Sequence, residues 1–327
     1  MNRQRITRWI IGLGVLIIVG GLAGLTFFLP HRTLRWWDPA YYEKPAWSPD
    51  ENRILYLYTQ RTNGTHLIVT DRNGILQQLD LALEIPRLPS WKSESEISVF
   101  LEQWGELGAD LKPHPVRLLI YDLATGTSQS VEAPLPIASG IAWHPDGSQA
   151  LISLRNTPPF TSTAVHPGIY RFTAADKQFR FWRTAEWPGA IKWSRDGRHV
   201  AFIDLVTGEN HKHWQVKIVD VQNDKPTNIA VTTGILWNDI WNDISWSPSG
   251  EWLLINGTIA SDLPSQSDVR GLYFISTTQL DHKVLWKSGD FADFDWSPNG
   301  EEVLVTTSGP LFGVSALQVL SVPKEYR

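Results

Sequence analysis

The pattern of apolar and polar positions divides the chain into two unequal parts. From Trp9 to Pro30 no residue carries a charge, and leucine, isoleucine, valine, glycine and phenylalanine dominate. As a helix, residues 9–29 would be about 30 Å long, which matches the core of a bilayer. After residue 31 the pattern changes to short apolar runs separated by polar turns. This second pattern predicts many short β-strands.

The uncharged run is interpreted as a membrane anchor. The residues before it include Arg3, Arg5 and Arg8 and no acid, a bias that is typical of the cytoplasmic side. A single N-terminal anchor followed by a large domain usually sends that domain across the membrane. We therefore expect residues 1–8 to be a short basic cytoplasmic tail and residues 9–29 a transmembrane helix. The remainder would be extracytoplasmic, on a bacterial cell membrane.

A cleaved signal peptide is the alternative interpretation of this segment. Its apolar region would run for about 7–15 residues and end in an A-x-A-like site. The run here is longer, and its best cleavage candidate, the sequence from Gly21 to Gly24, is a poor match. An uncleaved anchor is therefore the prediction.

One short motif recurs six times after the anchor. It consists of an apolar residue, a tryptophan and then a turn rich in proline, aspartate and glycine. The motif tryptophans are Trp47, Trp91, Trp143, Trp193, Trp246 and Trp296. Proline suits the second turn position, aspartate or asparagine the third and glycine the fourth, so each copy predicts a turn between two strands. The intervals of 44, 52, 50, 53 and 50 residues leave room for about four strands per unit.

This repeat predicts an all-β fold, a six-bladed β-propeller over residues 31–327, with units that begin near 43, 88, 139, 189, 242 and 291. The Trp-Ser-Pro-Asp-Gly motif resembles the repeat of the TolB-like propellers, relatives of the WD-repeat propellers. The second copy, which begins at Trp91, lacks the Pro-Asp-Gly turn. The resemblance implies a protein that binds other proteins or envelope components, with a repeat that is not itself catalytic.

The sixth unit supplies only three apolar runs before the chain ends. Residues 32–37 resemble an outer strand, because Trp36 precedes the first motif tryptophan by 11 residues, as Trp182 precedes the fourth. We expect this segment to pair with residues 316–322 and close the ring between the two ends of the chain. The face that carries the Pro-Asp-Gly turns, here called the turn face, would then lie next to the bilayer. The opposite face, the connection face, would point away from it.

Composition and motifs exclude several classes of function. The net charge is −5 with no long basic stripe, so nucleic acid is not expected as a partner. There is no cysteine, which excludes disulfides, thiolate metal sites and a cysteine nucleophile. No nucleotide-binding, hydrolase or metalloprotease motif is present. His211 and His213 could present two imidazoles to a metal, but no third ligand is evident. We predict no cofactor, and no small-molecule substrate is identified.

Acidic residues gather at one position of the repeat. Asp243 and Asp293 each lie three residues before a motif tryptophan, on the innermost strand of adjacent blades, with Asp239, Asp290 and Asp295 nearby. Innermost strands line the central channel, so Asp243 and Asp293 could bind a cation or a basic side chain of a partner. Lys44 holds the same position in the first blade, so an internal ion pair is equally compatible with the pattern.

A group of tryptophans falls in or beside the predicted connections of the connection face. They are Trp104, Trp187, Trp214, Trp237 and Trp241, with Asp239 and Asp243 beside the last two. Tryptophan is enriched where proteins bind partners, because it offers contact area at little entropic cost. These rings are therefore candidate contacts, together with Asp293. The alternative is that they cap the ends of the blades and are buried locally.

The leading hypothesis is a membrane-anchored, extracytoplasmic propeller that acts as a protein-binding or scaffold module, for example as an accessory subunit of a membrane complex. The alternative is an enzyme of the hydrolase or lactonase type that uses channel carboxylates. Three or more acidic or amide side chains converging at the channel mouth would favour the enzyme. A channel plugged by lysine, or an apolar one, would favour binding.

Overall fold

The computed structural model describes residues 40–60, 64–79, 85–102, 116–134, 137–155, 166–207, 212–222, 225–229, 243–259, 269–279, 283–308 and 315–327. They belong to one compact unit, Ala40–Arg327. The expected transmembrane helix and the expected closing strand at 32–37 lie outside the described residues. Within them, no helix is both long and apolar enough to cross a membrane.

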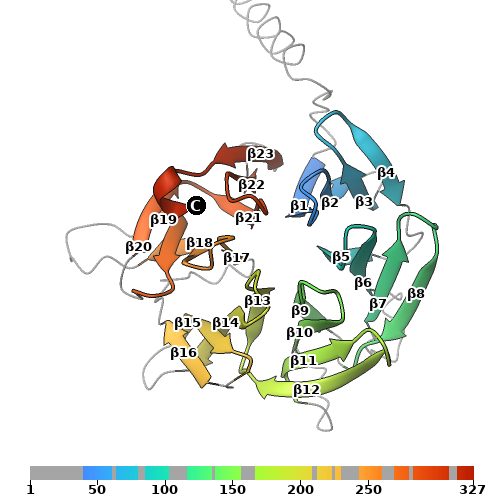
Figure 1. Ribbon diagram of the computed structural model, residues 1–327, viewed down its shortest axis with the longest axis horizontal. Helices are drawn as coiled ribbons and strands as arrows, with labels where there is room; N and C mark the ends of the chain where they lie inside the picture. Colours follow the sequence, from blue (N-terminus) through green and yellow to red (C-terminus); the bar gives the residue numbers. More distant parts are fainter. Residues whose placement is uncertain are drawn as a thin grey trace, which may run out of the picture. The chain divides into compact units, whose positions relative to one another are not determined.

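The unit is a ring of six antiparallel sheets, as the repeat predicts (Figure 1). The first blade comprises β1 (Ala40–Trp47), β2 (Ile54–Gln60), β3 (Gly64–Thr70) and β4 (Ile75–Leu79). The second comprises β5 (Ile85–Trp91), β6 (Glu96–Glu102), β7 (Arg117–Asp122) and β8 (Ser128–Glu132). The third comprises β9 (Ile137–Trp143), β10 (Gln149–Arg155), β11 (Gly168–Thr173) and β12 (Gln178–Thr184).

The remaining three blades follow the same order. The fourth comprises β13 (Pro188–Trp193), β14 (His199–Thr207), β15 (Lys212–Asp220) and β16 (Lys225–Ile229). The fifth comprises β17 (Ile244–Trp246), β18 (Trp252–Ile259), β19 (Val269–Ser276) and β20 (Lys283–Ser288). In the described part of the chain the sixth has three strands, β21 (Phe291–Trp296), β22 (Glu302–Ser308) and β23 (Ser315–Ser321), followed by a 3-10 turn at Lys324–Tyr326.

The serine of the repeat motif explains why the first turn of a blade is tight. Ser194 Oγ donates to Asp196 Oδ1 at 2.6 Å and accepts the backbone N–H of His199 at 2.9 Å. One hydroxyl thus ties the turn aspartate to the first residue of the next strand. Ser48 makes the equivalent bonds to Asp50 and to the N–H of Arg53, and Ser297 makes them to Asn299 and to the N–H of Glu302. Short polar side chains that bond to nearby backbone in this way favour turns over regular strands.

The core consists of apolar clusters, one between each pair of adjacent blades. Large side chains such as Phe100, Phe172, Phe202, Phe274 and Phe294 are fully buried there. One cluster joins the first and sixth blades and contains Trp47 and Leu304. Adjacent blades therefore pack by the same kind of apolar contact all the way around the ring, including at its junction.

Most motif tryptophans also bind the neighbouring blade through the indole N–H. Three of them donate to the carbonyl oxygen of the residue just before the tryptophan of the preceding blade, at 3.1–3.2 Å: Trp91 to Ala46, Trp193 to Ala142 and Trp246 to Lys192. Trp143 donates instead to Ser98 Oγ at 2.8 Å. The motif tryptophan thus has two structural roles. Its ring fills the core, and its N–H binds the inner strand of one blade to that of the next.

Candidate functional site

Three charged side chains meet inside the channel and link three blades. Lys44 of β1 places its Nζ 2.5 Å from Asp293 Oδ1 of β21 and 3.5 Å from Asp243 Oδ2, just before β17. The exposed fractions of these side chains are 18%, 6% and 9%, so the group is largely withdrawn from water. We call Lys44, Asp243 and Asp293 the Lys44 triad. The internal ion pair that the sequence left open is therefore present.

A distortion of the inner strand positions the triad. The pairing of β1 with β2 shifts register between Glu43 and Ala46, as in a β-bulge, and Lys44 takes a positive φ of 50°. A bulge re-aims side chains that would otherwise alternate across the strand. Asp293 also accepts the backbone N–H of Lys44 at 3.1 Å, so both the backbone and the ammonium group of this residue are held by one carboxylate.

The carboxylates keep Lys44 charged in spite of its burial. Burial by itself lowers the pKa of a lysine, but the attraction and hydrogen bonds of Asp243 and Asp293 outweigh this and raise the pKa of Lys44 above its ordinary value. The triad carries two negative charges and one positive charge. Any further ligand of these carboxylates would have to displace an ammonium group already bound to both of them.

Glu43 lies next to the triad, and its negative charge lowers the stability of the folded protein. Burial raises its pKa, the charge of Asp293 raises it further, and Arg87 and Lys44 oppose the shift. A raised pKa in a carboxyl group means that its charged form is disfavoured in the folded state, so the cost is present at neutral pH and disappears below the ordinary pKa of 4.5.

Replacing Glu43 by glutamine is therefore expected to stabilise the protein at pH 7, by less than about 1 kcal/mol. The gain should shrink as the pH falls toward 4.5, where the wild-type carboxyl is protonated. Urea unfolding at pH 7 and pH 4.5 measures both values. Glu132→Gln, at an exposed position of β8, is the control. A destabilised Glu43→Gln at pH 7 would show that the glutamate makes a net favourable interaction.

A second charged group lies two residues further along the inner strands. Lys192 of β13 reaches across the channel to Asp295 Oδ1 of β21 at 3.0 Å. Ser245 Oγ donates to the same oxygen at 3.4 Å, and Asp295 Oδ2 accepts the backbone N–H of Trp47 at 2.9 Å. We call Lys192, Ser245 and Asp295 the Asp295 cluster. Through its carboxylate it joins the first, fourth, fifth and sixth blades.

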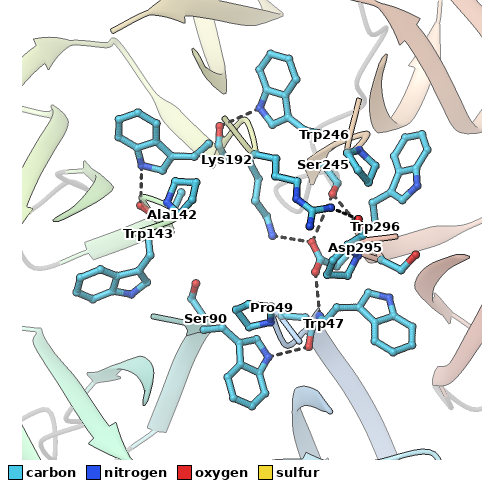
Figure 2. A pocket seen from close by; sticks show the side chains of 18 of the residues that line it. Trp47, Pro49, Ser90, Ala142, Trp143, Lys192, Ser245, Trp246, Asp295 and Trp296 are labelled. Atoms are coloured by element: carbon cyan, nitrogen blue, oxygen red, sulfur yellow. Dashed lines mark hydrogen bonds and ion pairs between the residues drawn. The ribbon is translucent and has the colours of Figure 1, made fainter. Parts of the chain in front are cut away.

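A cavity lies directly above the Asp295 cluster, on the turn face. It has a volume of about 400 Å³ and is lined by motif residues of all six blades, including the turn prolines Pro49, Pro145, Pro248 and Pro298. Figure 2 shows the rings of Trp47, Trp143, Trp246 and Trp296 around it, with Lys192 and Asp295 pointing toward each other across its centre. We call this cavity the basin. A second cavity, of about 40 Å³, lies between the Lys44 triad and Lys192.

The candidate tryptophans of the connection face are only partly described. Trp187 lies in the connection from β12 to β13, as expected, and is half-buried. Its backbone N–H donates to the buried Asp204 at 2.8 Å, and the guanidinium of Arg155 lies 5.1 Å from its ring centre. Trp214 lies on β15, but its side chain is not described. Trp104, Trp237, Trp241 and Asp239 lie outside the described residues, so their roles stay predictions.

Neither the role of Lys192 nor the basin is predicted from the sequence. Lys192 and Asp295 each occupy the position directly before a motif tryptophan, so the alignment that revealed Lys44 beside the aspartates could have revealed this pair too. No sequence pattern predicts that Lys192 passes the fifth blade to reach the sixth. Among the described residues, no group of three histidine, aspartate or glutamate side chains is arranged to hold a metal ion.

Comparisons with known proteins bear on the fold. No known family profile matches the sequence, and no curated protein matches it. TolB from Acinetobacter baumannii is similar in structure at 16% identity and a TM-score of 0.53, over 77% of this chain and 55% of that one. The chain thus spans about half the length of that TolB chain.

Other solved structures share the architecture. An oligogalacturonate lyase in complex with manganese aligns at 14% identity and a TM-score of 0.57, over 88% of this chain and 78% of that one. A chain of a nidogen/laminin complex aligns at 10% identity and a TM-score of 0.50, over 83% and 86%. These proteins differ in what they do, so the likeness concerns the fold. The chain is a six-bladed β-propeller that is similar in fold to TolB.

Proposed function

We propose that this chain is a membrane-anchored, extracytoplasmic propeller that binds a protein partner, as a scaffold or accessory subunit of a membrane complex. The observation that carries the proposal is that lysine side chains form ion pairs with the carboxylates of the channel. Asp243 and Asp293 are bound to Lys44, and Asp295 is bound to Lys192. A lysine-plugged channel is the arrangement that favours a binding module over an enzyme.

An enzyme of the hydrolase or lactonase type would need these carboxylates for a metal or for proton transfer. A general base has to reach its substrate within hydrogen-bond distance and to lose or accept a proton near the working pH. The triad carboxylates are buried and already share an ammonium group. Asp295 accepts bonds at both of its oxygens. These contacts give the three carboxylates a structural role, as links between blades.

The anchor supports a location at the membrane. The uncharged run at residues 9–29 is long enough to span a bilayer and follows three arginines. On the connection face, half-buried Trp187 lies under the guanidinium of Arg155, beside the ion pair of Asp204 with Lys217 at 2.7 Å. An aromatic ring with a polar surround is a common feature of protein interfaces. We place the partner on this face.

The proposal predicts that the full-length chain is recovered in the membrane fraction together with a partner that depends on Trp187. Affinity purification from solubilised membranes, followed by mass spectrometry, identifies the partner. Truncation of a central interface aromatic costs about 2 kcal/mol or more, which weakens affinity roughly 30-fold. Trp187→Ala should therefore lose most of the partner.

Trp182→Ala serves as the matched control, because Trp182 lies five residues earlier, on the outer strand β12. Thermal melts first establish that both variants fold. A folded Trp187→Ala that retains the partner in full would contradict the assignment of Trp187. Recovery of the chain without any stoichiometric protein would contradict the binding function itself.

A further inference from the structure

The basin is rich in hydrogen-bond donors and poor in available acceptors. Asp295, its one carboxylate, is already used at both oxygens. Ser245 Oγ donates to Asp295 and accepts the backbone N–H of Trp296 at 3.1 Å. At the rim, Ser297 Oγ donates to Asn299 and accepts the N–H of Glu302. A ligand that enters the basin therefore meets few acceptors to which it could donate.

Two cationic side chains of the basin have more N–H groups than the hydrogen bonds described for them use. A lysine ammonium has three N–H groups and an arginine guanidinium five. Within the described chain, the hydrogen-bond partner of Lys192 Nζ is Asp295. Arg195 extends from the turn of the fourth blade across the mouth and donates through Nη1 to the carbonyl oxygen of Pro298 in the sixth. Lys192 at the floor and Arg195 at the mouth thus face the same cavity.

The charged residues that line the basin also carry a net positive charge. The charged residues that line the basin are Lys92, Lys192, Arg195 and Asp295, whereas the whole chain carries −5. Within the described residues Lys92 is paired with Glu96 and Lys192 with Asp295, so the excess positive charge of the basin comes from Arg195 at its mouth. Cavities with one sign of charge and low-dielectric walls focus the field and attract ligands of the opposite sign.

We propose that the basin is an anion-binding site, in which a carboxylate group of the ligand binds between Lys192 and Arg195. The surrounding indole and proline rings would contact the apolar part that carries the carboxylate. A volume of about 400 Å³ is within the range of ligand pockets. The carboxylate can come from a small free acid or from an acidic segment of a polypeptide. The inference goes beyond the proposed function and does not depend on the connection face.

Isothermal titration of the full-length protein in detergent tests the site. The probes are succinate and an amidated hexapeptide of glutamate, each compared with its neutral counterpart, succinamide or a hexapeptide of glutamine. Saturable binding of at least one acidic probe is expected, with no binding of its neutral counterpart. Binding should weaken as salt is raised, because the charged groups at the mouth are screened. Tighter binding of the peptide identifies a polypeptide ligand, whereas binding of succinate alone identifies a small acid.

Two variants remove the proposed donors. Arg195→Gln, at an exposed position, should weaken binding about tenfold, as the loss of one charged hydrogen bond does. Lys192→Met combined with Asp295→Asn removes the floor cation without leaving its carboxylate unpaired, and should abolish binding. Arg198→Gln is the matched control, since Arg198 is exposed in the same turn and does not line the basin.

Three results would overturn the proposal: no saturable binding of either acidic probe, equal binding of the neutral counterparts, or unchanged affinity in both donor variants. None of these results bears on the partner that co-purifies through Trp187, so the two proposals fail separately.

Discussion

Replacing Lys44 by methionine is expected to lower the free energy of unfolding by about 3–5 kcal/mol. Methionine has similar length, so the loss is that of the charge and its hydrogen bonds. Asp243 and Asp293 would remain in the channel as two largely buried carboxylates without a cation. An uncompensated buried charge is among the costliest single changes a core can receive. Urea unfolding, followed by tryptophan fluorescence, measures the difference.

The variant Lys44→Met with Asp293→Asn separates charge from packing. If the loss of stability is electrostatic, removal of one unpaired carboxylate should recover part of it, whereas a packing defect would persist.

The pH dependence of the wild-type protein is a second test. Because the pKa of Lys44 is raised in the folded state, its contribution is complete below the ordinary value of 10.5 and is lost as the pH rises through the folded value. Equal stability of wild type and Lys44→Met at pH 8 would contradict this account.

Replacing Asn256 by alanine is expected to cost about 3 kcal/mol, since unpaired buried polar groups cost about 1–3 kcal/mol each. The Asn256 side chain is buried on β18 and links the fifth blade to the sixth. Its Nδ2 donates to the carbonyl oxygens of Phe291 and Ala292 at 2.9 and 2.8 Å, and its Oδ1 accepts the N–H of Asp243 at 2.8 Å. Alanine would leave these three backbone groups without this partner.

The matched control is Asn52→Ala, because Asn52 is exposed and its side chain bonds only within its own turn, to Asp50 at 3.2 Å. That change should alter stability by no more than about 0.5 kcal/mol. Thermal and urea unfolding of both variants measure the contrast. An Asn256→Ala protein as stable as the control would mean that the three backbone groups find other partners when the amide is removed.

The architecture was predictable because it is repeated. The motif tryptophan occurs once per blade, and in every copy except the second this core side chain is followed by residues that favour a turn between two strands. The confirmed features are those that depend on neighbours in sequence: the six sheets, the inner position of each motif strand and the turn that follows it. Asp243 and Asp293 were also identified as channel residues, since a fixed position in the repeat means a fixed depth in the ring.

The partners of those channel residues depend on contacts that the repeat does not encode. Alignment places Lys44 level with the two aspartates, and the register shift at Glu43–Ala46 recurs in the inner strands of other blades. The spacing of the blades and the length of the lysine side chain decide that its ammonium reaches both carboxylates. Whether Lys192 bonds its neighbour in the fifth blade or crosses to Asp295 depends on the width of the ring and the length of the side chain. The basin exists for the same reason: six turns that are far apart in sequence surround one axis, and the charge at its centre is set by Lys192 and Arg195 of the fourth blade and Asp295 of the sixth.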